Sequence, residues 1–120
     1  MSKAKQKGTS FEVLIRDYLI SKGFTHAHRP ALSGGKDTGD VNGIARRSTL
    51  RKVAVQCKNQ KQFQLSQWLN DTVEQAERLD GALPVLVVKR AGKGEKALDD
   101  TYVVMRLRDL SDLLIEADYT

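Results

Sequence analysis

The stretch KVAVQCK, residues 52–58, is the most informative part of this 120-residue sequence. Apolar and other side chains alternate along it, which is typical of a β-strand, because successive side chains of a strand point to opposite faces. The two valines and Cys57 therefore share one face and suit a hydrophobic core. Gln56 and Lys58 share the other face, and we expect them to face a cleft or solvent.

A second strand is predicted just before this one, at DVNGIAR, residues 40–46. The short polar connection between the two strands favours a β-hairpin. Pairing in a hairpin would place Asp40 near the Gln56 end of its partner, so that a carboxylate, an amide oxygen and the ammonium of Lys58 converge. The two oxygens are ligands of the kind that Mg²⁺ prefers, and Lys58 could orient or deprotonate an attacking water or neutralise a phosphate. This layout suits phosphodiester hydrolysis.

The first helix is predicted over residues 11–22, after Ser10 as a possible cap and before Gly23 as a stop. Its apolar side chains fall on one face at helical spacing. Glu12 lies roughly 100° from Phe11 on the helical wheel, at the margin of that face. It could therefore reach a site at the edge of the core and add a metal ligand, directly or through water.

The rest of the chain completes one mixed α/β domain over residues 10–120. Residues 1–9 are polar and lysine-rich, and we expect a basic flexible arm. The remaining elements are predicted as a strand at 24–29, a loop at 30–39, a helix at 64–80, strands at 83–90 and 101–106, and a helix at 109–117. The predicted order is αβββαββα, with a central mixed sheet flanked by helices.

Charge is divided unevenly along the chain. Residues 1–63 hold 13 Lys and Arg against 4 Asp and Glu, whereas residues 64–120 hold 7 against 11. A polyanion would meet the first half, which indicates nucleic acid as a partner, although a merely soluble basic surface is an equal alternative on charge alone. A single cysteine, no signal peptide and no apolar run near the ~20 residues of a membrane span favour an intracellular, cytoplasmic protein, with a phage gene as one possible source.

Several of these residues together resemble a known family. The matching elements are Lys7-Gly8-Thr9-Ser10-Phe11-Glu12, Arg29, Ser33-Gly34, Asp40-Val41 and Val55-Gln56-Cys57-Lys58. In this order and spacing they resemble the PD-(D/E)xK nuclease superfamily, and within it the archaeal-type Holliday-junction resolvases. The resemblance implies a restriction-endonuclease-like fold and a homodimeric endonuclease that uses Mg²⁺ or Mn²⁺ to cut branched or double-stranded DNA.

The resemblance also implies roles for individual residues. Glu12, Asp40, Gln56 and the backbone carbonyl of Cys57 would hold the metal, and Lys58 and Ser33 would complete the catalytic set. Arg29 and Ser33 would contact the scissile phosphate or the DNA backbone. Further backbone contacts, which do not read sequence, would come from Lys3, Lys5, Lys7 and Lys36. The strands at 83–88 and 101–105, or the last helix, could form the dimer interface.

One position departs from the family pattern: Gln56 stands where the second acid is expected. The form QCK resembles the D…QxK variant of Mrr-type endonucleases. Loss of a unit charge should lower metal affinity unless another side chain compensates. On the helix at 64–80, Asp71 and Gln75 are better placed for this than Glu74, which lies away from the predicted core. Asp37 is a second, weaker candidate for the motif acid.

Other functions remain open at this stage. The same residues would serve a restriction-like or repair nuclease, and Gln56 could instead mark a DNA-binding protein that retained the fold without cleavage. Each residue also has a purely structural explanation. Asp40 could end a turn, Glu12 could complement the helix dipole, and Gln56 and Lys58 could form the solvent face of a half-exposed strand.

Overall fold

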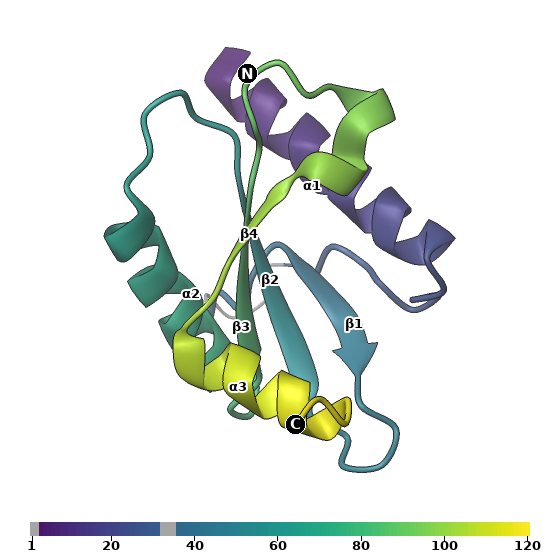
Figure 1. Cartoon of the computed structure of the whole chain (residues 1–120). Helices are drawn as coiled ribbons and strands as arrows, with labels where there is room; N and C mark the ends of the chain where they lie inside the picture. Colours follow the sequence, from purple (N-terminus) through teal and green to yellow (C-terminus); the bar gives the residue numbers. More distant parts are fainter. Residues whose placement is uncertain (1–2, 32–35) are drawn as a thin grey trace.

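The computed structural model describes residues 3–31 and 36–120. Three α-helices, one 3₁₀-helix and four strands make up the described chain (Figure 1). In chain order they are α1 (Lys3–Ser21), β1 (Val41–Ala45), β2 (Lys52–Lys58), α2 (Leu65–Arg78), β3 (Leu83–Val88), η1 (Glu95–Asp100), β4 (Tyr102–Val104) and α3 (Leu107–Glu116).

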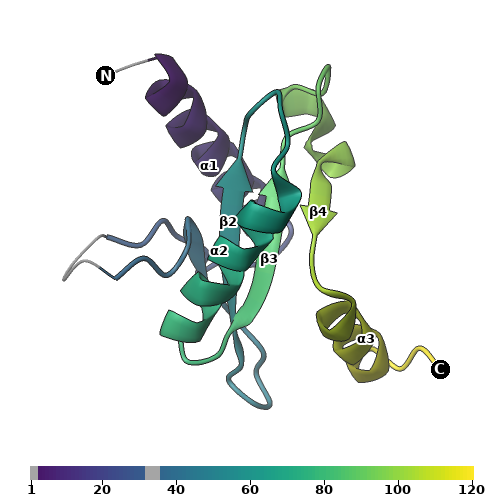
Figure 2. The ribbon, with the colours of Figure 1, turned by 90° about the vertical axis from the view of Figure 1, so that its left-hand side faces the viewer.

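The four strands form one mixed sheet in the order β1-β2-β3-β4. β1 and β2 form the predicted antiparallel hairpin, β2 and β3 run parallel, and β4 is antiparallel to β3. A helix must connect β2 to β3, because parallel neighbours need a long crossover, and α2 provides it across the sheet (Figure 2). The predicted α/β fold with a central mixed sheet is confirmed.

Each face of the sheet is covered by its own helix. On one face Phe11 and Ile15 of α1 pack against Val55 and Cys57, as the alternation in β2 predicts. On the other face Trp68 of α2 packs against β3. Because β3 is covered on both sides, it is apolar along its whole length. Cys57 is therefore a core residue.

The structure differs from the prediction in the segments that flank α1. The helix begins at Lys3, so Ser10 lies inside it and the described part of the predicted flexible arm is helical. The strand predicted at 24–29 is reduced to one bridge, between His28 and Asn42. A turn replaces the rest of it, in which the N–H of Ala27 donates to the carbonyl oxygen of Phe24 at 3.1 Å; Gly43, with φ +93°, allows the backbone of His26 to lie close against β1. The register between β1 and β2 shifts at the same place, between Val41 and Ile44, and regular pairing resumes at Ile44.

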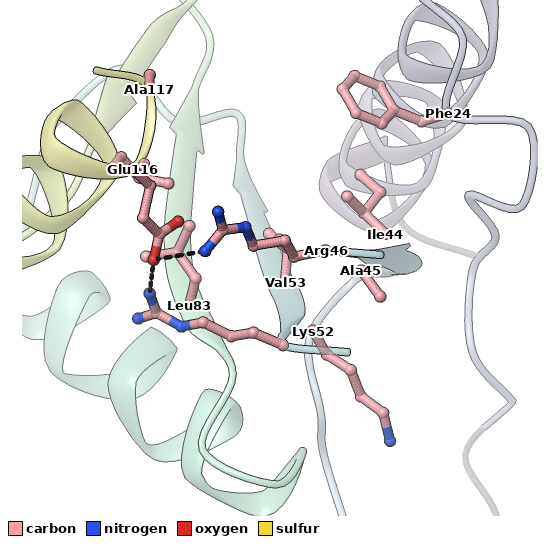
Figure 3. Close-up of a pocket in the computed structure, with 11 residues that line it drawn as sticks. Phe24, Ile44, Ala45, Arg46, Lys52, Val53, Leu83, Glu116 and Ala117 are labelled. Carbon is pink, nitrogen blue, oxygen red and sulfur yellow. Dashed lines mark ion pairs between the residues drawn. The ribbon is translucent and has the colours of Figure 1, made fainter. Parts of the chain in front are cut away.

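Charged groups attach α3 to the sheet. Asp109 is almost fully buried, lies 3.9 Å from Arg51 just before β2, and accepts hydrogen bonds at 2.8 and 3.3 Å from Arg106, the residue before α3. Glu116 lies 3.6 Å from Arg46 and 3.8 Å from Arg51, which belong to the β1–β2 connection, and Figure 3 shows both ion pairs. These pairs border a cavity of about 330 Å³ at the end of the sheet where β2 begins. The acidic face of α3 thus points inward.

Candidate active site

The candidate site lies at the opposite end of the sheet, where β1 begins and β2 ends. The backbone N–H of Asp40 donates to the carbonyl oxygen of Val55 at 2.7 Å, and the Asp40 carboxylate accepts from the N–H of Cys57 at 2.8 Å. These two bonds fix Asp40 to the strand that carries Gln56 and Lys58. The hairpin geometry predicted for Asp40 is confirmed.

Gly39 makes this close approach possible. Its φ is +108°, and a β-carbon on it would lie 3.0 Å from the carbonyl oxygen of Val55. A side chain at this position would push the chain away from β2, and the left-handed conformation would strain it. The glycine before Asp40 therefore places the carboxylate against the strand.

Four of the five residues predicted as catalytic line one cavity of about 460 Å³. They are Glu12, Asp40, Gln56 and Lys58, and Lys7 and Cys57 line it as well. Ser33, the fifth, lies outside the described residues. The helix α1 contributes Glu12 from the margin of its buried face, as its position on the wheel predicts. A second cavity, of about 210 Å³, shares Glu12 and Asp40 and reaches Arg29.

The two carboxylates are held close together. Burial raises the pKa of Asp40 to about 7; the hydrogen bond from Cys57 opposes the rise, and the nearby Glu12 carboxylate adds to it. Glu12 in turn lies 3.1 Å from the guanidinium of Arg29. Without a cation, burial and the Glu12 carboxylate therefore destabilise the ionised form of Asp40, and Asp40 carries a proton over part of the neutral range.

Gln56 is buried, and its side-chain oxygen has no hydrogen-bond partner among the described residues. A buried carbonyl oxygen without a donor is costly unless a ligand satisfies it. This free oxygen, with the carboxylates of Asp40 and Glu12, is a donor set that fits Mg²⁺ or Mn²⁺, since both accept few protein oxygens and complete their shell with water. In the described chain, no three His, Cys, Asp or Glu side chains form a metal cluster.

Asp37, the alternative motif acid, is hydrogen-bonded to its own loop and to α2. Its carboxylate accepts from the N–H of Gly39 and from the side-chain amide of Gln75, both at 2.9 Å. Its carbonyl oxygen accepts from Arg78 at 3.1 Å. Asp37 therefore anchors the loop before Asp40 to α2. The sequence offers one sign of this anchor, a polar residue, Gln75, on the inner face of an amphipathic helix.

The other residues considered as replacement ligands on α2 do not reach the cavity lining. Asp71 accepts from Gln67, and Glu74 is exposed beside Arg78, facing away as the helical wheel indicates. Among the predicted DNA contacts, Lys3, Lys7 and Lys36 are exposed, whereas Arg29 is paired with Glu12. The side chain of Lys5 lies outside the described part of the structure.

A comparison with known families agrees with this geometry. A family model described as "Phage putative PDDEXK endonuclease" matches residues 3–119. The chain belongs to this family. The phage PDDEXK endonuclease family lies within the PD-(D/E)xK superfamily, so that part of the resemblance seen in the sequence is confirmed. Members of the superfamily are generally divalent-metal-dependent nucleases.

No curated protein and no solved structure matches the chain at a significant level. In the part of the chain that the structure describes, no helix is long and apolar enough to cross a membrane.

Proposed function

We propose that the chain is a Mg²⁺- or Mn²⁺-dependent DNA endonuclease whose catalytic centre is Glu12, Asp40, Gln56 and Lys58. The observation that carries this proposal is the attachment of Asp40 to β2, which brings its carboxylate into one cavity with Gln56 and Lys58. A buried carboxylate, an unpartnered amide oxygen and an ammonium group in one cavity have little structural purpose. Action on DNA and a single buried cysteine support a cytoplasmic location.

Each residue would have a separate task. Asp40, Glu12, the Gln56 side-chain oxygen and the Cys57 carbonyl would hold the metal, whose chemistry is to acidify the attacking water and to stabilise negative charge on the phosphate. Lys58 would orient that water or neutralise the phosphate. Arg29, which pairs with Glu12, would keep that carboxylate in place and contact the scissile phosphate. Ser33, Lys3, Lys5, Lys7 and Lys36 would contact the DNA backbone.

As the specific activity we propose Holliday-junction resolution, by resemblance to the archaeal-type resolvases. The test is incubation of the purified protein with a synthetic four-way junction and with a matching linear duplex, in Mg²⁺, Mn²⁺ or EDTA. Symmetric nicks in the junction alone would support a resolvase. Equal cutting of the duplex would favour a restriction-like or repair nuclease instead, and binding without cleavage in either metal would contradict both.

Gln56 provides a test of the metal site. We expect Gln56→Glu to retain or raise cleavage and to lower the Mg²⁺ concentration needed for half-maximal rate by about tenfold, because a carboxylate restores the missing charge. Gln56→Leu, which has no oxygen ligand, should lower the rate at least about tenfold. The measurement is the rate of nicking against metal concentration. Equal metal dependence in all three proteins would show that Gln56 is no ligand.

We also propose that the protein acts as a homodimer through α3. The inward face of this helix is acidic, so an apolar stripe of Leu107, Leu110 and Leu114 faces outward, with exposures of 78%, 40% and 41%.

Light scattering after size exclusion tests the dimer. We expect the wild type to have twice the chain mass and the double variant Leu107→Glu, Leu114→Glu to have the mass of one chain, because four buried carboxylates would have to be desolvated. Ile20→Glu, at a similarly exposed leucine-sized residue on α1, is the control and should remain dimeric. A wild type with the mass of one chain at micromolar concentration would contradict the proposal.

A further inference from the structure

A row of side chains crosses the sheet beside the candidate active site. The strand register pairs Lys58 with Val88 and Val88 with Tyr102, so all three point to the face that α2 covers. Lys58 lies over the ring of Trp68, with its nitrogen 5.8 Å from the ring centre. The row therefore connects a candidate catalytic residue on β2 with an aromatic residue on the edge strand β4.

Phe63 joins the aromatic residues at the outer end of this row. Its ring centre is 6.1 Å from that of Trp68 and 6.2 Å from that of Tyr102, and the contact with Tyr102 is edge-to-face. Trp68 is 4% exposed, but Phe63 and Tyr102 are 43% and 44% exposed. Two adjacent aromatic residues are thus more than 40% exposed, at the end of the sheet where cleavage is proposed.

The surface around Phe63 is strongly basic. A cavity of about 520 Å³ is lined by Phe63 and by four cationic residues, Lys7, Lys61, Lys89 and Arg90, and no acidic side chain of the described residues lines it. Arg90 also lies 4.9 Å from the ring centre of Tyr102. This cavity and the candidate active site share Lys7, Asn59, Gln60 and Lys61, so the two are continuous.

Core packing explains Trp68 but not Phe63 and Tyr102. Trp68 and Leu69 of α2 already pack against Leu86 and Val88 of β3, and the loop that carries Phe63, residues 59–64, has no other apolar side chain. Cations that follow a sugar-phosphate backbone, combined with exposed aromatic faces on which bases stack, are the usual means of binding single-stranded nucleic acid. A base within an intact duplex cannot stack on a protein ring.

We propose that Phe63 and Tyr102 form an aromatic surface for an unpaired base of the DNA strand that enters the active site. Because the two rings are nearly perpendicular, the base would stack on the face of one ring and contact the edge of the other. The basic cavity would hold the phosphates on either side of that base. The preferred substrate is therefore DNA with unpaired bases close to the scissile phosphate, as at a branch, a flap or a gap. This inference rests on the proposed nuclease function, because it takes the cavity with Asp40 and Lys58 as the site of cleavage.

Binding measured in EDTA tests the stacking surface without cleavage. The probes are a fluorescently labelled duplex and the same duplex with a single-stranded flap that contains 2-aminopurine. We expect the wild type to bind the flap probe about tenfold more tightly than the duplex, since stacking of one base contributes on that order. The 2-aminopurine fluorescence should fall on binding, which reports stacking directly.

Variants separate stacking from general affinity. Phe63→Ala and Tyr102→Ala should lose the preference for the flap and the change in fluorescence, while duplex binding stays within about twofold of wild type, because the lysines still supply the phosphate contacts. Phe63→Trp and Tyr102→Phe keep an aromatic ring and should keep both signals. Phe24→Ala, which removes an equally exposed phenylalanine near the other end of the sheet, is the matched control and should behave as wild type.

Failure of the inference and failure of the proposed function give different results. If Phe63→Ala and Tyr102→Ala both keep the preference for the flap, or if no preference exists in the wild type, the stacking surface is wrong even where the protein cuts DNA. If the preference depends on the two rings but no metal supports cleavage, the stacking surface holds and the nuclease proposal fails. Circular dichroism of each variant confirms that the fold is intact, and Tyr102→Ala gives the answer should Phe63→Ala fail to fold.

Discussion

Replacement of Lys58 by methionine is expected to reduce DNA cleavage by about 100- to 1000-fold, because removal of one positioned group that stabilises transition-state charge has effects of this order. Methionine keeps the length of the side chain and its contact with the ring of Trp68, so the fold should be preserved. The measurement is the single-turnover rate of nicking in Mg²⁺. Affinity for DNA in EDTA should change less than about threefold, because other cations contribute most of the binding.

The control for this variant is Lys96→Met, which removes an exposed lysine of η1 outside the candidate site. Its cleavage rate should equal that of the wild type. A Lys58→Met protein that cuts within tenfold of the wild-type rate would contradict the role given to Lys58.

Replacement of Asp40 by asparagine is expected to change activity and stability in opposite directions. Asparagine keeps an oxygen that accepts from the N–H of Cys57 but lacks the charge that a metal needs, so cleavage should fall by at least about 1000-fold. The folded protein without metal should become more stable at pH 8, by about 2 kcal/mol, since the buried charge and its repulsion from Glu12 are removed.

The pH dependence of this gain follows from the sign of the pKa shift. Asp40 has its pKa raised from 3.8 to about 7 in the folded chain. Between these values the folded state holds a proton that the unfolded state has released, so the stability of the wild type falls as pH rises from about 4 to about 7. Asp40→Asn should therefore match the wild type near pH 4 and exceed it from pH 7 upward.

Urea unfolding in EDTA at pH 4 and pH 8 measures this difference. Addition of Mg²⁺ should then stabilise the wild type and leave the variant unchanged, because only the wild type retains the site. Equal stability of the two proteins at pH 8 in EDTA would show that neither burial nor Glu12 destabilises the Asp40 carboxylate in the folded protein.

The sequence predicted the central part of the site because it depends on local rules. Alternation in residues 52–58 separates Cys57 from Gln56 and Lys58, and a short connection requires a hairpin that places Asp40 at the far end of its partner. The structure shows both features, with Cys57 in the core beneath α1 and Asp40 bonded to the backbone of β2. Such features follow from strand geometry and need no knowledge of distant contacts.

Features that depend on tertiary contacts could not be predicted in this way. The strand expected at 24–29 is replaced by a turn between Phe24 and Ala27, and its one bridge, from His28 to Asn42, depends on how β1 lies beside it. The ion pair of Arg29 with Glu12 and the anchor from Asp37 to Gln75 connect segments whose distance in space the sequence does not reveal.

The contact between Phe63 and Tyr102 also could not be predicted from the sequence. Tyr102 meets Phe63 only because β4 pairs with β3 in one particular register, which places Tyr102 opposite Val88. A shift of one residue would turn Tyr102 to the other face of the sheet. The sequence shows only a single phenylalanine in a polar loop and a tyrosine at the start of a short strand.

The central claim is that Asp40 belongs to a metal-dependent nuclease centre, and nicking of a supercoiled plasmid tests it most directly. Purified wild type and Asp40→Asn are compared at equal concentration, each with Mg²⁺, with Mn²⁺ and with EDTA. We predict open-circular product from the wild type in at least one of the two metals, none in EDTA, and none from Asp40→Asn under any condition. Equal nicking by both proteins, or nicking by the wild type in EDTA, would contradict the assignment of Asp40 and of the metal.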